Sequence, residues 1–145
     1  AYEIAVAQGE AKARHFMGIS VEQDRYNLNS RLPELEILPA CRDLGIGFVA
    51  WGPLSGGLLA GKSKDSVRRN SFSGTELELS KRFCDVCKKA GMPEADVALA
   101  WLLNNPVVTA PIIGVRTLEQ LENCLRALEI KLPEDMLQEL ELIFP

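Results

Sequence analysis

The sequence lacks the features that mark membrane and nucleic-acid-binding proteins. It has no apolar run approaching the roughly 18 residues that a transmembrane helix needs, and its acidic start has no apolar block typical of a signal peptide. Its net charge is −4 and it has no long basic stripe, which argues against binding to nucleic-acid phosphates. We therefore expect no membrane span, no nucleic-acid partner and a cytoplasmic location.

Histidine and cysteine are too few, and too poorly spaced, to predict a zinc site. His15 is the single histidine, and Cys84 and Cys87 form one C-x-x-C pair that no second pair follows. That pair falls inside a predicted helix, so a metal or redox role is the less favoured reading. With Cys41 and Cys124 it makes four cysteines, which we expect to be reduced core residues rather than a disulfide framework.

The chain has enough apolar residues for one domain with a core, since 47% of its 145 residues are hydrophobic. Apolar runs that predict strands alternate with segments that predict helices. This order indicates an α/β fold with about three parallel strands, either in an open sheet or in part of a barrel. The predicted strands are 16–23, 46–51 and 107–115, and the predicted helices are 2–14, 33–44, 73–90, 93–104, 118–128 and 134–143.

Local signals define several helix faces and ends. Ser73 or Thr75 is a suitable N-cap, and Gly45 and Gly91 are suitable C-terminal stops. Spacings of three and four residues predict two buried helix faces. These faces are Leu35, Leu38 and Cys41 in one helix, and Leu118, Leu121, Leu125 and Leu128 in another.

Polar or glycine-rich residues follow each predicted strand. Gln23 ends the first strand, the second runs through Trp51 into a glycine-rich loop, and the third leads to Arg116 before a helix. The C-terminal ends of parallel strands meet at one edge, so these features are expected to converge on a ligand. Trp51 offers a ring for stacking, and a helix N-terminus beside Arg116 suits a phosphate. The alternatives are a surface Gln, a core Trp and an ordinary turn with a solvated Arg.

Several motifs, which occur in the same order as in the family, resemble the C-terminal half of an aldo-keto reductase. The resemblance is to the bacterial or plant branch related to potassium-channel β-subunit-like enzymes. They cover the chain nearly end to end: Gln23-Asp-Arg-Tyr-Asn-Leu with Arg31, Glu34 and Glu36, then 38–62, 96–103 and 113–123. The resemblance implies a (β/α)8 barrel that reduces a carbonyl substrate with hydride from NADPH. The chain then forms a partial domain, 1–145, containing the later strands of the barrel.

The resemblance also assigns residues to the cofactor. It implies that Gln23 hydrogen-bonds the nicotinamide carboxamide and that Trp51 stacks on the nicotinamide ring, where the family more often has Tyr. The loop after Trp51 is expected to wrap the pyrophosphate, and the segment before the next helix to hold the adenosine and its 2′-phosphate. The loop residues are Gly52, Pro53, Leu54, Ser55, Gly57 and Lys62; the second set is Gly114, Val115, Arg116, Gln120 and Asn123. Cys124 stands where the family usually has Asn.

Nothing in the sequence matches the motifs of the family's catalytic Asp, Tyr, Lys and His, which lie in the first half of the barrel. We therefore assign no catalytic residue and expect negligible reductase activity from the isolated chain. A second hypothesis is a non-catalytic half-barrel that assembles with another copy or with a complementary half. A third is a nucleotide-binding regulator. The substrate and the preference for NADPH over NADH stay open.

Overall fold

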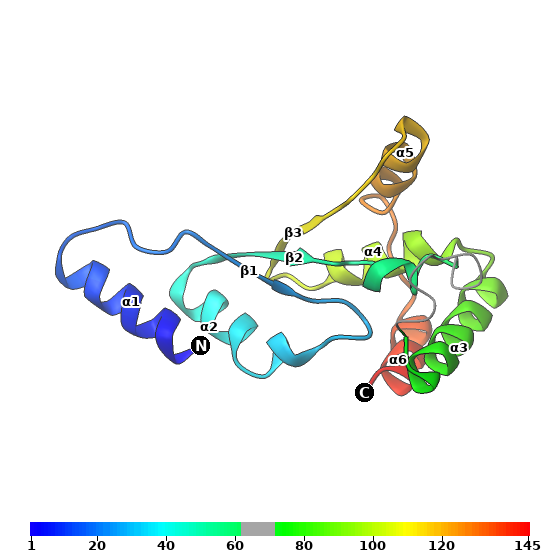
Figure 1. Ribbon diagram of the computed structural model, residues 1–145, viewed down its shortest axis with the longest axis horizontal. Helices are drawn as coiled ribbons and strands as arrows, with labels where there is room; N and C mark the ends of the chain where they lie inside the picture. Colours follow the sequence, from blue (N-terminus) through cyan, green and yellow to red (C-terminus); the bar gives the residue numbers. More distant parts are fainter. Residues whose placement is uncertain (62–71) are drawn as a thin grey trace.

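The computed structural model describes residues 1–61 and 72–145. These residues form an α/β arrangement with three strands and flanking helices (Figure 1). In chain order the elements are α1 (Tyr2–Ala13), β1 (Val21–Arg25), the 3₁₀ helix η1 (Leu32–Glu34), α2 (Ile37–Leu44), β2 (Gly47–Trp51), the 3₁₀ helix η2 (Ser55–Gly57), α3 (Gly74–Ala90), α4 (Glu94–Asn104), β3 (Val108–Ile112), α5 (Leu118–Arg126) and α6 (Glu134–Ile143).

The sheet has the order β1-β2-β3 and both strand pairs are parallel, which confirms the predicted fold class. The register places Gln23 opposite Val49, and it places Arg25 and Ile112 on either side of Trp51. All three strands therefore end at the same edge of the sheet. This arrangement is consistent with part of a (β/α)8 barrel.

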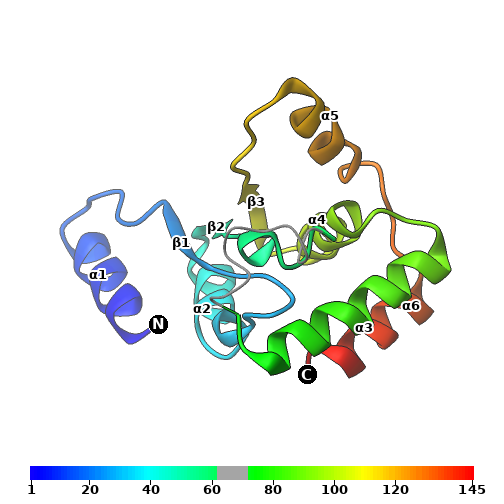
Figure 2. The same ribbon diagram turned by 45° about the vertical axis from the view of Figure 1, so that its right-hand side comes forward.

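The two faces of the sheet differ sharply in burial. On one face Phe48 and Ala50 are fully buried in a core that includes residues of α2, α3, α4 and α6. Helices α3 and α6 lie side by side in Figures 1 and 2. The opposite face stays open, since Trp51 is 45% and Ile112 is 43% exposed. Side chains alternate between the faces of a strand, so the open face carries every second residue.

Helix termini form largely as the sequence predicts. Ser73 caps α3: its hydroxyl accepts from the backbone N–H of Glu76, and the Glu76 carboxylate accepts from the backbone N–H of Ser73. Gly45 and Gly91 end α2 and α3 in the left-handed region, with φ of 67° at each. Glycine adopts this conformation without the steric cost that a Cβ imposes.

A polar network joins the segment after β1 to the end of the chain. Arg31 donates two hydrogen bonds to Glu34, at 2.8 and 2.7 Å, and one to the carbonyl of Phe144 at 2.7 Å. Tyr26 donates from its hydroxyl to the same Glu34 carboxylate at 2.7 Å. Burial raises the pKa of Tyr26 above its ordinary value, and the hydrogen bond to Glu34 is the second largest cause of the increase. The network therefore fixes η1 against the residues after α6.

The first predicted strand was placed too early in the sequence. Strand β1 begins only at Val21, and Phe16 and Met17 are 69% and 88% exposed. The side chain of Gln8 explains the difference, because it accepts from the N–H of Ile19 and donates to the carbonyl of Ile19. Residues 16–20 are thereby held beside α1 as a connection. Strand β1 has no fully buried residue, since its residues alternate between exposed and half-buried.

Two predicted helix faces also require correction. The helix expected from Pro33 begins as η1 and becomes α-helical only at Ile37, so Leu35 is 75% exposed while Leu38 and Cys41 are buried. In α5 the leucine face is largely uncovered: Leu118 is 71%, Leu125 51% and Leu128 66% exposed. Figures 1 and 2 show α5 standing away from the sheet, which leaves these leucines exposed. None of the described helices is both long and apolar enough to cross a membrane.

Candidate functional site

Trp51 lies at the end of β2, in the middle of a row of side chains on the open face. Arg25 and Ile112 are its register partners on β1 and β3, and all three are exposed. The Arg25 guanidinium carbon lies 5.9 Å from the centroid of the Trp51 ring, which is a cation–π contact. Gln23 is on the same face, two residues earlier on β1. The structure therefore brings together the predicted amide and the predicted stacking ring.

Asn27 fixes the turn that follows Trp51. Its side-chain amide is buried and donates to the carbonyl of Gly52 at 2.8 Å, and its oxygen accepts from the N–H of Asn29 at 2.9 Å. The carbonyl of Gly52 accepts a second bond, from the N–H of Ser55 at 2.9 Å. The sequence analysis missed this positioning role. The available signal was an Asn two residues after the end of a strand, in the segment that resembles the family.

The loop after β2 contains an unusual serine. Ser55 is buried and has a φ of 48°, a left-handed conformation that costs a non-glycine residue energy. Its hydroxyl has no hydrogen-bond partner among the described residues. Gly57 has a φ of 99°, and a Cβ built there would meet nothing within 4 Å. The loop thus offers a polar hydroxyl and open backbone. The predicted contact of Lys62 lies outside the described residues.

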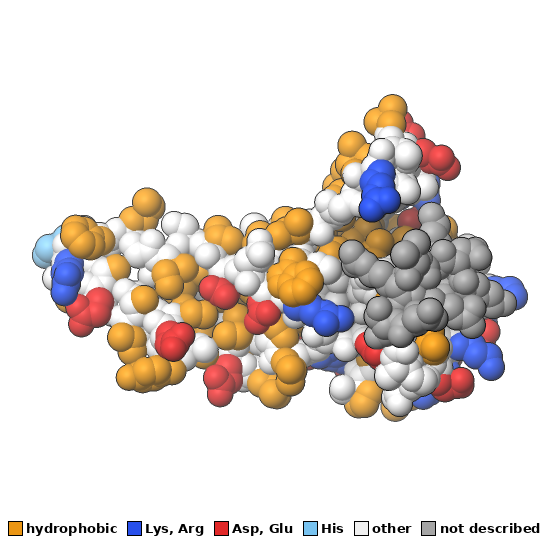
Figure 3. Space-filling model, in the orientation of Figure 1, with side chains coloured by type: hydrophobic (Ala, Val, Ile, Leu, Met, Phe, Trp, Pro, Cys, Tyr) orange, Lys and Arg blue, Asp and Glu red, His pale blue; other side chains and the backbone are white. Residues whose placement is uncertain are grey.

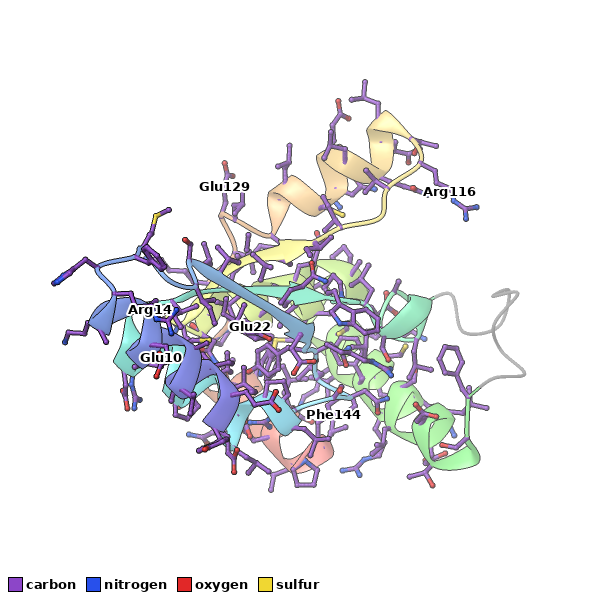
Figure 4. All side chains as sticks on the ribbon, turned by 60° about the vertical axis from the view of Figure 1, so that its left-hand side comes forward. Glu10, Arg14, Glu22, Arg116, Glu129 and Phe144 are labelled. Atoms are coloured by element: carbon purple, nitrogen blue, oxygen red, sulfur yellow. The ribbon has the colours of Figure 1, made fainter. Side chains whose placement is uncertain are left out.

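Residues 114–117 connect β3 to the N-terminus of α5. Thr117 caps that helix by accepting from the N–H of Gln120, and the Gln120 side chain accepts from the N–H of Arg116 at 2.8 Å. Figure 4 shows the Arg116 side chain at this end of α5, pointing away from the rest of the chain. Two of the predicted cofactor residues, Arg116 and Gln120, are therefore adjacent. Gly114 and Arg116 are exposed and Val115 is half-buried.

Asn123 already has a partner within the chain. Its side-chain oxygen accepts from Arg126, whose Nε also forms an ion pair with Asp96 at 3.1 Å. Asp96 belongs to α4, so this contact attaches α5 to the neighbouring helix. The contact of Asn123 with adenosine stays a prediction. It requires the Asn123 amide either to bind adenosine while still bonded to Arg126 or to release Arg126.

The surroundings of the cysteines bear on the alternative of a metal or redox role. All four are free thiols, and no group of three potential metal ligands occurs in residues 1–61 and 72–145. Burial raises the pKa of every thiol, and it raises that of Cys87 to about 12. A raised pKa keeps a thiol protonated and unreactive near neutral pH.

A cavity of about 450 Å³ lies elsewhere, beside the Arg31 network. Tyr26, Arg31, Glu34 and Trp101 are among its lining residues, and none of the predicted cofactor residues that the structure describes lines it. The strand-end row around Trp51 therefore remains the better candidate site, because it combines an exposed ring, an amide and a strained loop at one edge of the sheet.

Comparison with known proteins identifies the family. The sequence profile of the Aldo/keto reductase family matches residues 2–143. The chain is 49% identical over 151 residues to the uncharacterized oxidoreductase YrpG of Bacillus subtilis, covering 99% of this chain and 46% of that protein. It is 36% identical to the aldo-keto reductase NECHADRAFT_45914 of Fusarium vanettenii, covering 99% of this chain and 41% of the relative. It is 31% identical to the versiconal hemiacetal acetate reductase of Aspergillus parasiticus, covering 82% and 38% respectively.

These comparisons support the recognition of the family, while its branch stays a prediction. The chain spans less than half the length of each of the three relatives. The match extends across every described helix and strand, from α1 to α6. The chain belongs to the aldo/keto reductase family.

Proposed function

We propose that this chain is the NADP(H)-binding half of an aldo-keto reductase that reduces a carbonyl group. The observation that carries this proposal is the exposed Trp51 ring at the end of β2, followed directly by a strained loop. The family membership supports a nicotinamide cofactor. When bound, the nicotinamide supplies the hydride for carbonyl reduction. The proton donor is not assigned to this chain.

The residues present fit such a cofactor. The Ser55 hydroxyl is buried with no partner among the described residues, and an added phosphate oxygen would satisfy it. Trp51 offers a half-exposed flat ring, and Gln23 places an amide on the same face. In this proposal Gln23 orients the carboxamide, Trp51 stacks on the ring, and the loop at 52–57 binds the pyrophosphate.

The segment before α5 is proposed to hold the adenosine half. Arg116 is exposed at the N-terminus of this nine-residue helix, where backbone N–H groups favour an anion. A bidentate contact from its guanidinium would recognise the 2′-phosphate. This predicts that Arg116→Ala weakens binding of NADPH much more than binding of NADH, which lacks that phosphate.

Calorimetric titration of the 145-residue protein with NADPH tests the proposal. Trp51→Ala is expected to weaken NADPH binding about tenfold, because stacking on an aromatic side chain contributes roughly 1–3 kcal/mol per base. Tyr2→Ala is the matched control, since Tyr2 is 80% exposed on α1 and is expected to have no effect. Absence of NADPH binding at millimolar concentration would overturn the proposal. The isolated chain is expected to show negligible carbonyl reduction.

A second candidate function is a half-barrel that assembles with another copy or a complementary half. The open face of the sheet and the exposed leucines of α5 favour it, because exposed apolar surface of this kind marks interfaces. Strands β1 and β3 also pair only with β2 in the described sheet. If copies of the chain assemble with one another, light scattering after size exclusion is expected to show a species larger than 16.0 kDa. A monomer rules out this self-assembly.

We also propose a cytoplasmic location. The four free thiols favour a reducing compartment, where cysteines without disulfides are usual. A nucleotide-binding regulator remains the third hypothesis. It predicts that the chain binds NADPH both alone and after assembly with a complementary half. It also predicts that the assembled protein reduces no carbonyl group.

A further inference from the structure

Arg25 places a positive charge over the ring of Trp51, the proposed nicotinamide platform. It is the last residue of β1, it lies opposite Trp51 in the register, and its guanidinium carbon is 5.9 Å from the Trp51 ring centroid. Both side chains are exposed on the open face of the sheet. Figure 3 shows a basic side chain directly beside hydrophobic ones near the centre of the face in view. Anything that stacks on Trp51 therefore meets this charge.

The surrounding residues leave the charge of Arg25 available. The Asp24 carboxylate accepts from the backbone N–H of Arg25, and Arg25 forms no ion pair with any residue in 1–61 or 72–145. The charge of Arg25 also reaches Glu76, whose pKa is lowered first by its bond to the Ser73 backbone and last by the charge of Arg25. The hydrogen bonds that the Glu76 carboxylate accepts come from Ser73 and Asn29 and none comes from the Arg25 guanidinium.

We propose that Arg25 makes the site discriminate between the two oxidation states of the nicotinamide, favouring the reduced ring over the oxidised one. The inference rests on the proposed function, because it requires the ring to stack on Trp51. The reduced ring is neutral. Loss of a hydride to the carbonyl carbon of the substrate transfers two electrons and one proton, and it leaves the ring with a positive charge.

The rest of the cofactor is the same in both states, so the ratio of the two affinities isolates the charge on the ring. A guanidinium several ångströms from that ring repels the oxidised form of the cofactor. The surrounding solvent screens this repulsion in part. Coulomb's law at about 6 Å, with an effective dielectric constant of about 40 to 80, gives a preference of about three- to tenfold. This repulsion assists loading of the reduced cofactor and release of the oxidised one.

The test is to measure Kd for NADPH and for NADP⁺ by calorimetry in the unaltered protein and in Arg25→Gln, Arg25→Lys and Arg42→Gln. Arg42 is the matched control, because it is an exposed arginine of α2 paired with Asp43. The ratio Kd(NADP⁺)/Kd(NADPH) is expected to fall about three- to tenfold in Arg25→Gln. It is expected to be retained in Arg25→Lys and unchanged in Arg42→Gln.

Salt provides a second measurement on the unaltered protein, which does not depend on the folding of any variant. The ratio is expected to decline between about 50 and 500 mM salt, because the Debye length shortens across this range. If both forms bind and the ratio responds neither to Arg25→Gln nor to salt, this inference is overturned and the proposed function stands. If neither form binds, the proposed function itself fails.

Discussion

Replacing Arg31, the residue before η1, with methionine is expected to destabilise the chain because it breaks a partly buried polar network. Arg31 makes two hydrogen bonds to Glu34, one to the carbonyl of Phe144 and an ion pair with Glu141. Its guanidinium carbon also lies 5.4 Å from the centroid of the Trp101 ring. Methionine keeps most of the apolar stem, so the loss is mainly polar.

The magnitude follows from the exposure of the partners. The Arg31 side chain is 19% exposed and that of Glu34 is 29%, so their bidentate pair is shielded from solvent, whereas Glu141 is 51% exposed. Removing one partner of a fully buried pair costs roughly 3–5 kcal/mol, and partial exposure reduces this. An exposed partner such as Glu141 contributes well under 1 kcal/mol. We expect a loss of about 3 kcal/mol, equivalent to a fall in Tm of about 10 °C.

Urea unfolding followed by circular dichroism measures this loss. Arg42→Met is the control, because Arg42 and Asp43 are 65% and 66% exposed and their pair should contribute less than about 0.5 kcal/mol. A double-mutant cycle with Glu34→Gln is expected to give a coupling energy of at least about 1 kcal/mol. If Arg31→Met costs no more than Arg42→Met, the reasoning from burial and bidentate geometry is wrong.

Three further predictions concern local features. Ser73→Ala should cost about 1 kcal/mol in unfolding free energy by removing the cap of α3, while Thr75→Ala should cost less than about 0.5 kcal/mol; equal costs would contradict the observed capping box. Because the pKa of Cys87 is raised to about 12 in the fold, its contribution to stability is complete below about pH 8.5 and is lost as pH rises toward 12. The urea midpoint should therefore fall above pH 8.5, and less steeply in Cys87→Ala. Ser55→Gly should stabilise the fold by about 1 kcal/mol, because it removes left-handed strain and a buried hydroxyl, yet weaken NADPH binding; a loss of stability would refute the strain argument.

Features set by local backbone chemistry were predictable from the sequence. Gly45 and Gly91 end helices as expected, since a left-handed C-cap favours glycine in any tertiary setting. The end of β2 at Trp51 was also predicted correctly, because the following Gly-Pro cannot continue a strand. Both signals depend on residues adjacent in sequence. The common edge of the three strand ends then follows from their parallel pairing.

Features that depend on distant partners were not predictable. The apolar run at 16–19 looks like a strand, yet Gln8 holds Ile19 beside α1 from eleven residues away. The leucines of α5 have the spacing of a buried face, but periodicity does not say what covers that face. Similarly, no sequence pattern reveals that the Ser55 hydroxyl is buried in a left-handed turn without a described partner.

The alternation of β1 separates stability from the proposed site. Arg25 is exposed on the open face beside Trp51, whereas the next residue, Tyr26, is 1% exposed and joins the Arg31 network through Glu34. The two systems are joined by a backbone hydrogen bond, in which the N–H of Tyr26 donates to the carbonyl of Trp51 at 3.4 Å. A hydrogen bond of that length is weak, so the energetic coupling between the Arg31 network and the residues around Trp51 should be small. Arg31→Met should therefore lower stability without changing the ratio of NADP⁺ to NADPH affinity, and Arg25→Gln should do the reverse. A change in that affinity ratio in Arg31→Met, measured where the protein is fully folded, would show that the core network positions the Trp51 ring.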